Sequence, residues 1–163
     1  MEKSEFIEIK VNFKNMINDL NVIYAQAGPE DELAIRDLLK ELEGDRSQLG
    51  MSRFYIAKVD NNLIGCVRTK IIGDGGLELA SLAVNKKYQG RGIGSGLVEE
   101  LLLKETERPI FLLTEQSKES FYKKFNFNII APSDLPSEFK KEYNRIISMP
   151  FVKNLKVIAM VID

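Results

Sequence analysis

The chain has 163 residues, of which 44% are hydrophobic and 29% are charged, and its formal net charge is −1. This length favours a single domain over residues 1–163 with a sizeable core. The near-neutral charge provides no broad field that would attract nucleic acid or an anionic membrane. No apolar run approaches the roughly 18 residues of a membrane span, and the first residues lack the apolar core of a signal peptide. We therefore expect no nucleic-acid or membrane partner.

Two residue types limit the available chemistry. Histidine is absent, and Cys66 is the only cysteine. Without histidine there can be no His-based catalytic triad and no His-ligated metal site, so we expect no metal cofactor. A single cysteine excludes an internal disulfide and suits a reducing cytoplasm, where we expect the protein to reside. Acid–base chemistry must therefore use carboxylate, tyrosine, lysine or cysteine side chains.

The first half of the chain alternates between strand and helix patterns. Residues 1–20 show little pattern and are interpreted as an N-terminal extension packed on the domain. Residues 21–26 are typical of a strand, and 28–44 of a helix that is opened by proline and acidic residues and closed by Gly44. Residues 53–72 predict a β-hairpin with its turn at 60–62.

Residues 77–103 predict a buried strand, a glycine-rich turn and an amphipathic helix. A glycine inside a helix costs about 1 kcal/mol relative to alanine, so four of them at this turn need a physical reason. A helix start carries unpaired N–H groups and the positive end of the helix dipole, and a phosphate can approach them where β-carbons are missing. The alternative is a tight turn with no ligand. The four glycines are Gly90, Gly92, Gly94 and Gly96.

The apolar pattern of the central strand changes phase. Leu77 and Leu79 occupy odd positions, whereas Leu82 and Val84 occupy even ones. One extra residue near Ala80-Ser81 would restore the alternation, which predicts a β-bulge. The alternative is a buried strand with an irregular apolar pattern.

The second half of the chain continues the alternation of elements. A short buried strand at 109–114 follows the central helix, and a strand–helix–strand unit implies a parallel, right-handed crossover. We expect a short helix at 117–125, ended by Asn126 in the left-handed conformation. A strand at 127–131, a helix at 137–146 and a last strand at 156–162 complete the chain. The order predicts an α/β protein with a mixed sheet and helices on both faces.

The glycine motif distinguishes between classes of phosphate site. A P-loop needs Gly-Lys-Ser or Gly-Lys-Thr, which is absent, and the dinucleotide spacing fails when counted from Gly90 or from Gly92. The pattern present is Gln89-x-x-Gly92-x-Gly94 between an apolar strand and an amphipathic helix. It resembles the acetyl-coenzyme A signature of the GNAT N-acetyltransferase superfamily, and the resemblance extends over residues 21–162.

The resemblance implies a fold and a coenzyme site. The fold would be GNAT-like, an α/β (α+β) arrangement with a mixed sheet of about seven strands and a bulged strand splayed from the next. Acetyl-CoA would be the co-substrate, with its pantetheine arm in the gap between the two strands. The implied coenzyme-binding residues are Leu82, Ala83, Val84, Gln89, Gly90, Arg91, Gly92, Ile93, Gly94 and Ser95.

The resemblance also implies two catalytic residues. Glu78 lies eleven residues before Gln89, where related enzymes carry a carboxylate base that acts directly or through water. The segment around Tyr122 resembles the family motif Phe-Tyr-x-x-x-Gly-Phe, whose tyrosine protonates the departing sulfur. The alternatives are a solvated strand carboxylate and a tyrosine that only packs. Two positions depart from the family pattern. Asn126 replaces a glycine, and Glu115 replaces an asparagine that often contacts the coenzyme.

Other polar residues are weaker candidates. Arg53, Arg68 and Lys70 lie on the hairpin that borders the acceptor cleft in the resembled fold. They could bind a carboxylate or could be surface charges. Cys66 is interpreted as a small buried residue and not as a nucleophile.

The sequence thus predicts an acetyl-CoA-dependent N-acetyltransferase in which a primary amine attacks the thioester directly in a ternary complex. The acceptor is expected to be a small molecule. Asp134-Leu135-Pro136 and the C-terminal segment resemble the amino-acid N-acetyltransferase (N-acetylglutamate synthase-like) branch. One alternative is a peptide or protein N-acetyltransferase, for which an open acidic groove would be the mark. Another is a non-catalytic acetyl-CoA-binding regulatory protein. Whether the chain forms a homodimer is left open.

Overall fold

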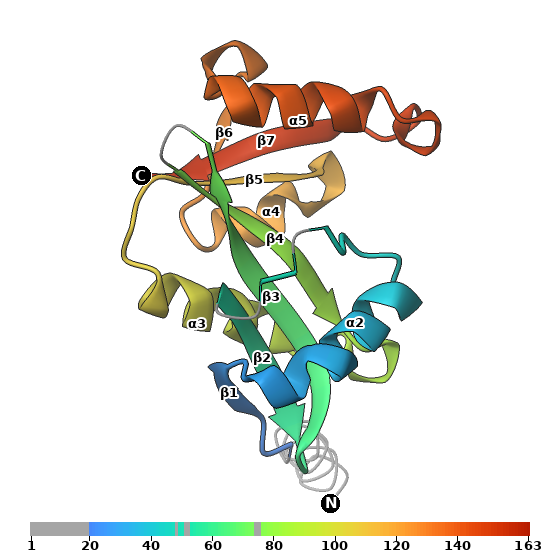
Figure 1. Cartoon of the computed structure of the whole chain (residues 1–163). Helices are drawn as coiled ribbons and strands as arrows, with labels where there is room; N and C mark the ends of the chain where they lie inside the picture. Colours follow the sequence, from blue (N-terminus) through green and yellow to red (C-terminus); the bar gives the residue numbers. More distant parts are fainter. Residues whose placement is uncertain (1–19, 48, 51–52, 74–75) are drawn as a thin grey trace, which may run out of the picture.

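A computed structural model describes residues 20–47, 49–50, 53–73 and 76–163 of the chain. Within these residues, seven strands form one open sheet in the order β1-β2-β3-β4-β5-β7-β6 (Figure 1). The strands are β1 (Ile23–Gln26), β2 (Phe54–Val59), β3 (Asn62–Ile72), β4 (Gly76–Val84), β5 (Ile110–Glu115), β6 (Asn128–Ile130) and β7 (Val157–Ile162). The α-helices are α2 (Glu32–Glu41), α3 (Ile93–Lys104), α4 (Glu119–Lys123) and α5 (Ser137–Ile147).

This sequence of elements confirms the predicted order of strands and helices and the predicted fold class. The sheet is mixed, because β4 and β5 run parallel whereas the other neighbouring strands are antiparallel. The predicted hairpin is β2–β3, and its turn residues Asp60 and Asn61 both have positive φ. Most of the predicted N-terminal extension, residues 1–19, lies outside the described residues.

Helices cover both faces of the sheet because the strands carry apolar residues on both sides. In β2, Tyr55 and Ala57 pack in the core that contains α3, whereas Phe54 and Ile56 pack in the core that contains α2. Tyr122 of α4 belongs to the same core as α3. On the α2 side, Phe139 of α5 packs on Phe111 of β5, with ring centroids 5.4 Å apart.

The predicted β-bulge lies in β4, the strand at the centre of the fold. In the β3–β4 pairing, Cys66 faces Ala83 and Arg68 faces Ala80, so β4 contains one residue more than β3 between these pairs. Ser81 has a φ of 53°, which is the left-handed conformation typical of one form of bulge. The bulge reverses the side on which even-numbered residues point. This places Glu78 on the α2 and α5 face and turns Leu82 and Val84 to the α3 face.

The splay predicted between β4 and β5 is also present. The two strands pair only through Leu77 with Ile110 and Glu78 with Phe111, and the rest of β4 runs apart from β5. Two strands that part in this way leave backbone groups of β4 available to a ligand.

Among the described helices, α2 and α4 are each followed by a residue in the left-handed conformation. Asn126 follows α4 with a φ of 67°, as predicted. After α2, however, Glu43 adopts this conformation with a φ of 54°, and the N–H of Gly44 donates to the carbonyl of Leu39 at 2.8 Å. Gly44 thus completes the helix end without supplying its left-handed residue. Within the described residues, no helix combines the length and apolar character needed to cross a membrane.

Candidate active site

A cavity of about 740 Å³ lies where β4 parts from β5, on the face covered by α3 and α4. It is bounded by the end of β4, the glycine-rich turn, the start of α3, the end of β5 and α4. Its lining residues are Leu82, Val84, Tyr88, Gln89, Gly90, Gly92, Ile93, Gly94, Ser95, Thr114, Glu115, Lys118, Phe121 and Tyr122. Eight of the ten predicted coenzyme-binding residues are therefore brought together around one space.

The start of α3 presents backbone donors to this cavity. The helix begins at Ile93, and the N–H of Gly96 makes an early helical hydrogen bond to the carbonyl of Gly92 at 3.0 Å. The N–H groups that precede Gly96 have no partner within the helix. A β-carbon added at Gly94 would lie 3.9 Å from its nearest neighbours, so its absence leaves open space beside these donors. Gly92 has a φ of 78°, which a residue with a side chain rarely adopts.

At position 96, the structural reason for a glycine differs from the phosphate contact that the sequence suggested. A β-carbon at this position would overlap the hydroxyl and ring of Tyr24, which comes from β1. The glycine therefore allows β1 to pack closely against α3, and it is not among the residues that line the cavity. The sequence contains no local signal for this contact, because Tyr24 and Gly96 are far apart along the chain.

For three of the predicted coenzyme-binding residues, the side chain contacts another part of the protein. The side chain of Gln89 donates a hydrogen bond to the carbonyl of Val84 at 2.9 Å, which fixes the turn against the end of β4. The Arg91 guanidinium lies 6.0 Å from the Tyr88 ring centroid and is exposed outside the cavity lining. Ala83 points to the opposite face, where it packs in the core of α2.

Tyr122 reaches the cavity from α4 and is 9% exposed. Its ring is held edge-on by Phe121 and Phe127, with centroid separations of 4.9 and 6.0 Å. Burial raises the pKa of Tyr122 to about 12, so its phenol keeps its proton at neutral pH. The side chain is therefore placed and protonated as a proton donor to a group in this cavity would have to be.

Glu78 lines a second cavity, of about 530 Å³, on the opposite face of the sheet. The two predicted catalytic side chains therefore lie on opposite sides of the splay. This second cavity, called the α5-side cavity below, lies between the 43–46 segment, β4, and the segment from α5 to Val152. Its lining residues are Glu43, Gly44, Asp45, Arg46, Glu78, Leu79, Ala80, Ser81, Leu113, Glu142, Arg145, Ile146, Met149, Phe151 and Val152.

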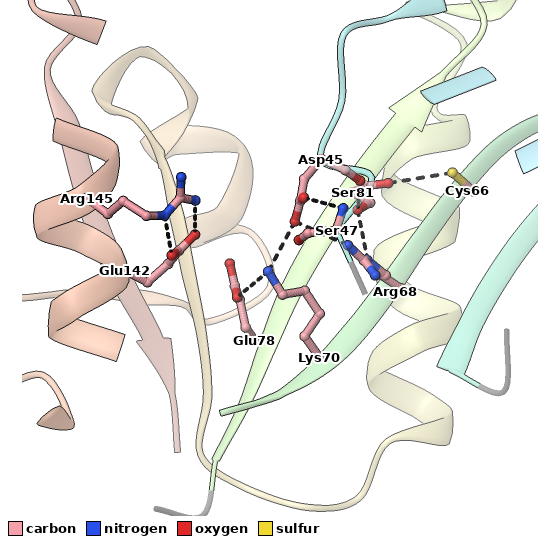
Figure 2. A network of polar contacts seen from close by, with 9 residues as sticks. All are labelled: Asp45, Ser47, Cys66, Arg68, Lys70, Glu78, Ser81, Glu142 and Arg145. Carbon is pink, nitrogen blue, oxygen red and sulfur yellow. Dashed lines mark hydrogen bonds and ion pairs between the residues drawn. The ribbon is translucent and has the colours of Figure 1, made fainter. Parts of the chain in front are cut away.

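A network of charged side chains surrounds Glu78 (Figure 2). The Lys70 ammonium lies 3.2 Å from Oε2 of Glu78 and 3.1 Å from Oδ2 of Asp45. Burial raises the pKa of the Glu78 carboxyl, and the opposing effect of Lys70 does not cancel this. Burial alone would lower the pKa of Lys70, but Glu78 and Asp45 together raise it, so Lys70 remains a cation. A carboxylate with a raised pKa is better matched to accepting a proton near neutral pH.

Arg68 fixes the bulge to the neighbouring segment. Its side chain is 1% exposed, its Nε donates to Oγ of Ser81 at 3.0 Å, and a terminal nitrogen lies 3.2 Å from Oδ2 of Asp45. The Ser81 hydroxyl in turn donates to the carbonyl of Asp45 at 3.0 Å. Arg68 is thus a structural cation beneath the cavity, and Lys70 is the cation that contacts Glu78.

The contacts of the remaining candidate residues show where each of them lies. Arg53 pairs with Glu105 at 3.4 Å beyond the end of α3 and lines neither cavity. Cys66 is fully buried, and burial raises the pKa of its thiol to about 12. It is therefore a packed thiol, as predicted. Glu115 lines the first cavity, where its carboxylate accepts a hydrogen bond from the Ser117 hydroxyl at 3.0 Å.

Sequence reasoning missed several lining residues. Lys118 lies four residues before Tyr122, and this spacing could have placed it on the same side of the helix. Asp45 stands in a polar loop with no pattern to single it out. The sequence pattern predicts Glu142 and Arg145 to be exposed charges on a helix, and no local signal places them opposite Glu78. Figure 2 shows this pair, which forms a two-point ion pair with a shortest separation of 2.5 Å, facing Glu78 and Lys70.

A protein-family model described as "Acetyltransferase (GNAT) domain" matches residues 50–129. Residues 50–129 therefore resemble a GNAT acetyltransferase domain. The match covers the hairpin and also the bulged strand, the glycine-rich turn, α3, β5 and α4, and these last five contribute the lining of the first cavity. The family predicted from the motif around Gln89 is thereby confirmed, and the domain is that of an acyltransferase family.

Solved structures share the fold. N-acetylglutamate synthase from Neisseria gonorrhoeae, complexed with coenzyme A and N-acetyl-glutamate, has a TM-score of 0.68 and 24% identity. The alignment covers 87% of this chain but only 35% of the synthase, so this chain spans about a third of that enzyme's length. A GNAT family acetyltransferase from Elizabethkingia anophelis with acetyl-CoA bound has a TM-score of 0.65 and 23% identity, and covers 88% of this chain and 98% of its own.

Naa50 from Arabidopsis thaliana, in complex with the bisubstrate analogue CoA-Ac-MVNAL, has a TM-score of 0.58 and 17% identity. The alignment covers 88% of this chain and 99% of Naa50. At these identities the likeness establishes the fold. Within the described residues, no group of three or more acidic or cysteine side chains is arranged to hold a metal ion.

Proposed function

We propose that the protein is an acetyl-CoA-dependent N-acetyltransferase that acetylates a primary amine of a small molecule. The observation that carries this proposal is the splay between β4 and β5. It opens a cavity between a bulged strand and the free N–H groups at the start of α3. The solved GNAT structures with coenzyme A or acetyl-CoA bound support the same reading.

The chain's own residues fit a coenzyme of this kind. The N–H groups of Ile93, Gly94 and Ser95 would donate to its diphosphate, because the helix start offers unpaired donors and the positive end of the dipole. Leu82 and Val84 would pair with its amide-containing arm along the part of β4 that β5 leaves uncovered. The coenzyme would supply the activated acetyl group.

Two side chains would move the protons. Glu78 would accept the proton of the acceptor ammonium, directly or through a water molecule, from the α5-side cavity. Tyr122 would donate its phenolic proton to the departing sulfur in the first cavity, and its phenolate would take up the second proton that the nitrogen loses as the amide forms. A backbone N–H near Val84 would stabilise the oxygen that becomes negative as the amine attacks. In this arrangement the acceptor and the coenzyme approach from opposite sides of the splay, which suits direct transfer in a ternary complex.

The test is release of free thiol from acetyl-CoA by the purified chain across a panel of amines. The proposal predicts amine-dependent thiol release well above the hydrolysis rate, together with a product of the mass of the acetylated amine. A protein that binds acetyl-CoA but releases no thiol with any amine would be a coenzyme sensor, and this outcome would reject catalysis. Peptides form a separate arm of the panel, because Naa50 shares the fold.

A further inference from the structure

We propose that the acceptor is a primary amine on an uncharged apolar body, with no carboxylate beside the amine. This inference rests on the proposed function and narrows its substrate class. It comes from the two chemically different sides of the α5-side cavity. A cavity of about 530 Å³ lies within the size range of small-molecule sites.

One side of the cavity is apolar. Ile146, Met149, Phe151 and Val152 come from the end of α5 and the turn after it, and Leu113 of β5 adjoins them. Phe151 is 76% exposed although it lines the cavity, so its ring is available to an apolar group that enters. Covering this ring with an apolar substrate removes both surfaces from water, which favours binding.

The other side is charged, and two cations, Arg145 in the lining and Lys70 behind Asp45 and Glu78, already face carboxylates. Lys70 lies between Asp45 and Glu78, and Arg145 forms its two-point pair with Glu142. A carboxylate on the acceptor would have to compete with these bonded carboxylates for the same donors, and it would lie close to Glu78. An ammonium faces no such competition, because a carboxylate accepts several hydrogen bonds and Lys70 contacts Oε2 of Glu78.

Arg46 is the remaining guanidinium of the lining, and it is exposed in the 43–46 segment. A carboxylate paired there would remain in contact with water, where an ion pair contributes little. The charges of the cavity therefore favour one cationic nitrogen at Glu78, and the apolar side favours a hydrocarbon or aromatic body against Phe151.

The experiment measures kcat/KM for thiol release with matched amines. 2-Phenylethylamine carries the apolar body alone, L-phenylalanine adds a carboxylate, L-phenylalaninamide adds an uncharged group of similar size, and ethylamine lacks the body. We expect kcat/KM for 2-phenylethylamine and L-phenylalaninamide to exceed that for L-phenylalanine and ethylamine by about tenfold or more. Spermidine and a phenylalanyl tetrapeptide are included to test polyamine and peptide acceptors.

A variant pair links the preference to the cavity. Phe151→Ala should raise KM for 2-phenylethylamine several-fold while leaving the kinetics with ethylamine unchanged. Leu103→Ala is the matched control, because Leu103 is 72% exposed on α3 and lines neither cavity. It should leave both substrates unaffected.

The outcomes separate this inference from the proposed function. If L-phenylalanine, spermidine or the tetrapeptide is acetylated as well as 2-phenylethylamine or better, the acceptor class is wrong although the enzyme is an acetyltransferase. If Phe151→Ala affects ethylamine equally, the apolar side does not bind the substrate body. If acetyl-CoA binds but no amine releases thiol, the proposed function itself fails.

Discussion

The ammonium nitrogen of Lys70 lies 3.2 Å from Oε2 of Glu78, and the two residues are register partners on adjacent strands β3 and β4. Asp45 holds the same ammonium from the other side at 3.1 Å. Glu142 and Arg145 on α5 and Arg68 on β3 are further charged groups near this pair. The Lys70 ammonium thus contacts both the proposed base and a carboxylate of the 43–46 segment. The ionisation of Glu78 can therefore be tested by substituting Lys70.

Replacing Glu78 with glutamine should lower kcat by about 10²-fold or more, because the amide keeps the shape of the side chain but cannot accept the proton. The affinity for acetyl-CoA should not change, since Glu78 lines the α5-side cavity and not the first. Steady-state kinetics with the best amine and calorimetric titration of acetyl-CoA measure the two effects. Unchanged turnover in Glu78→Gln would remove Glu78 from the mechanism.

The pH dependence should follow the charge of Glu78. Burial raises the pKa of this carboxyl, and the base acts only when ionised. The acidic limb of kcat/KM should therefore lie above the pH expected for an ordinary carboxyl, with activity rising as pH rises through the Glu78 pKa. Lys70→Met removes the cation that opposes the shift, so the limb should move further towards high pH. Lys70→Arg should largely restore it, and a limb at the same pH in all three proteins would contradict this account.

Tyr122→Phe should lower kcat more than it weakens acetyl-CoA binding, because only the phenolic proton is lost while the ring packing with Phe121 and Phe127 remains. An effect of about 10²-fold on kcat is expected for a general acid. Thermal unfolding provides the control for packing, and it should be nearly unchanged. Wild-type turnover in the variant would leave Tyr122 with a packing role alone.

Gly94→Ala should stabilise the fold and weaken coenzyme binding. Alanine is favoured over glycine inside a helix by about 1 kcal/mol, so the variant should unfold at a higher temperature. Its β-carbon, however, would enter the space beside the N–H groups of α3 and should weaken acetyl-CoA binding.

The control is Gly50→Ala, since Gly50 also has open space around it but lines neither cavity. Equal affinity for acetyl-CoA in Gly94→Ala and the wild type would mean that the start of α3 does not bind the coenzyme.

Gly96→Ala should destabilise the protein despite the better helix propensity of alanine. The added β-carbon would overlap Tyr24, and overpacking of this kind typically costs about 1–3 kcal/mol. Chemical denaturation measures the change in the free energy of unfolding. In a Tyr24→Ala background the same substitution should be neutral or stabilising. A destabilisation of equal size in both backgrounds would show that Tyr24 is not the cause.

Much of the fold could be predicted because the signals are local. Strand alternation and helix periodicity indicated the order of the elements, the phase change at Ala80-Ser81 indicated the bulge, and the tolerance of Asn126 for the left-handed conformation indicated the end of α4. Each of these depends on the steric preferences of neighbouring residues. The same is true of the glycine-rich turn, because glycine permits the positive φ that Gly90 and Gly92 adopt there.

The sequence by itself determined the strand–turn–helix unit that carries the family signature and the two residues, Glu78 and Tyr122, that could move protons. Only the tertiary structure decided what surrounds them. Asp45, Glu142 and Phe151 come from segments distant in sequence, and they meet β4 because the 43–46 segment and α5 approach the same face of the sheet. No local propensity encodes such a meeting. It follows from how the helices bury their apolar sides against the sheet, and that packing is settled by the whole chain at once.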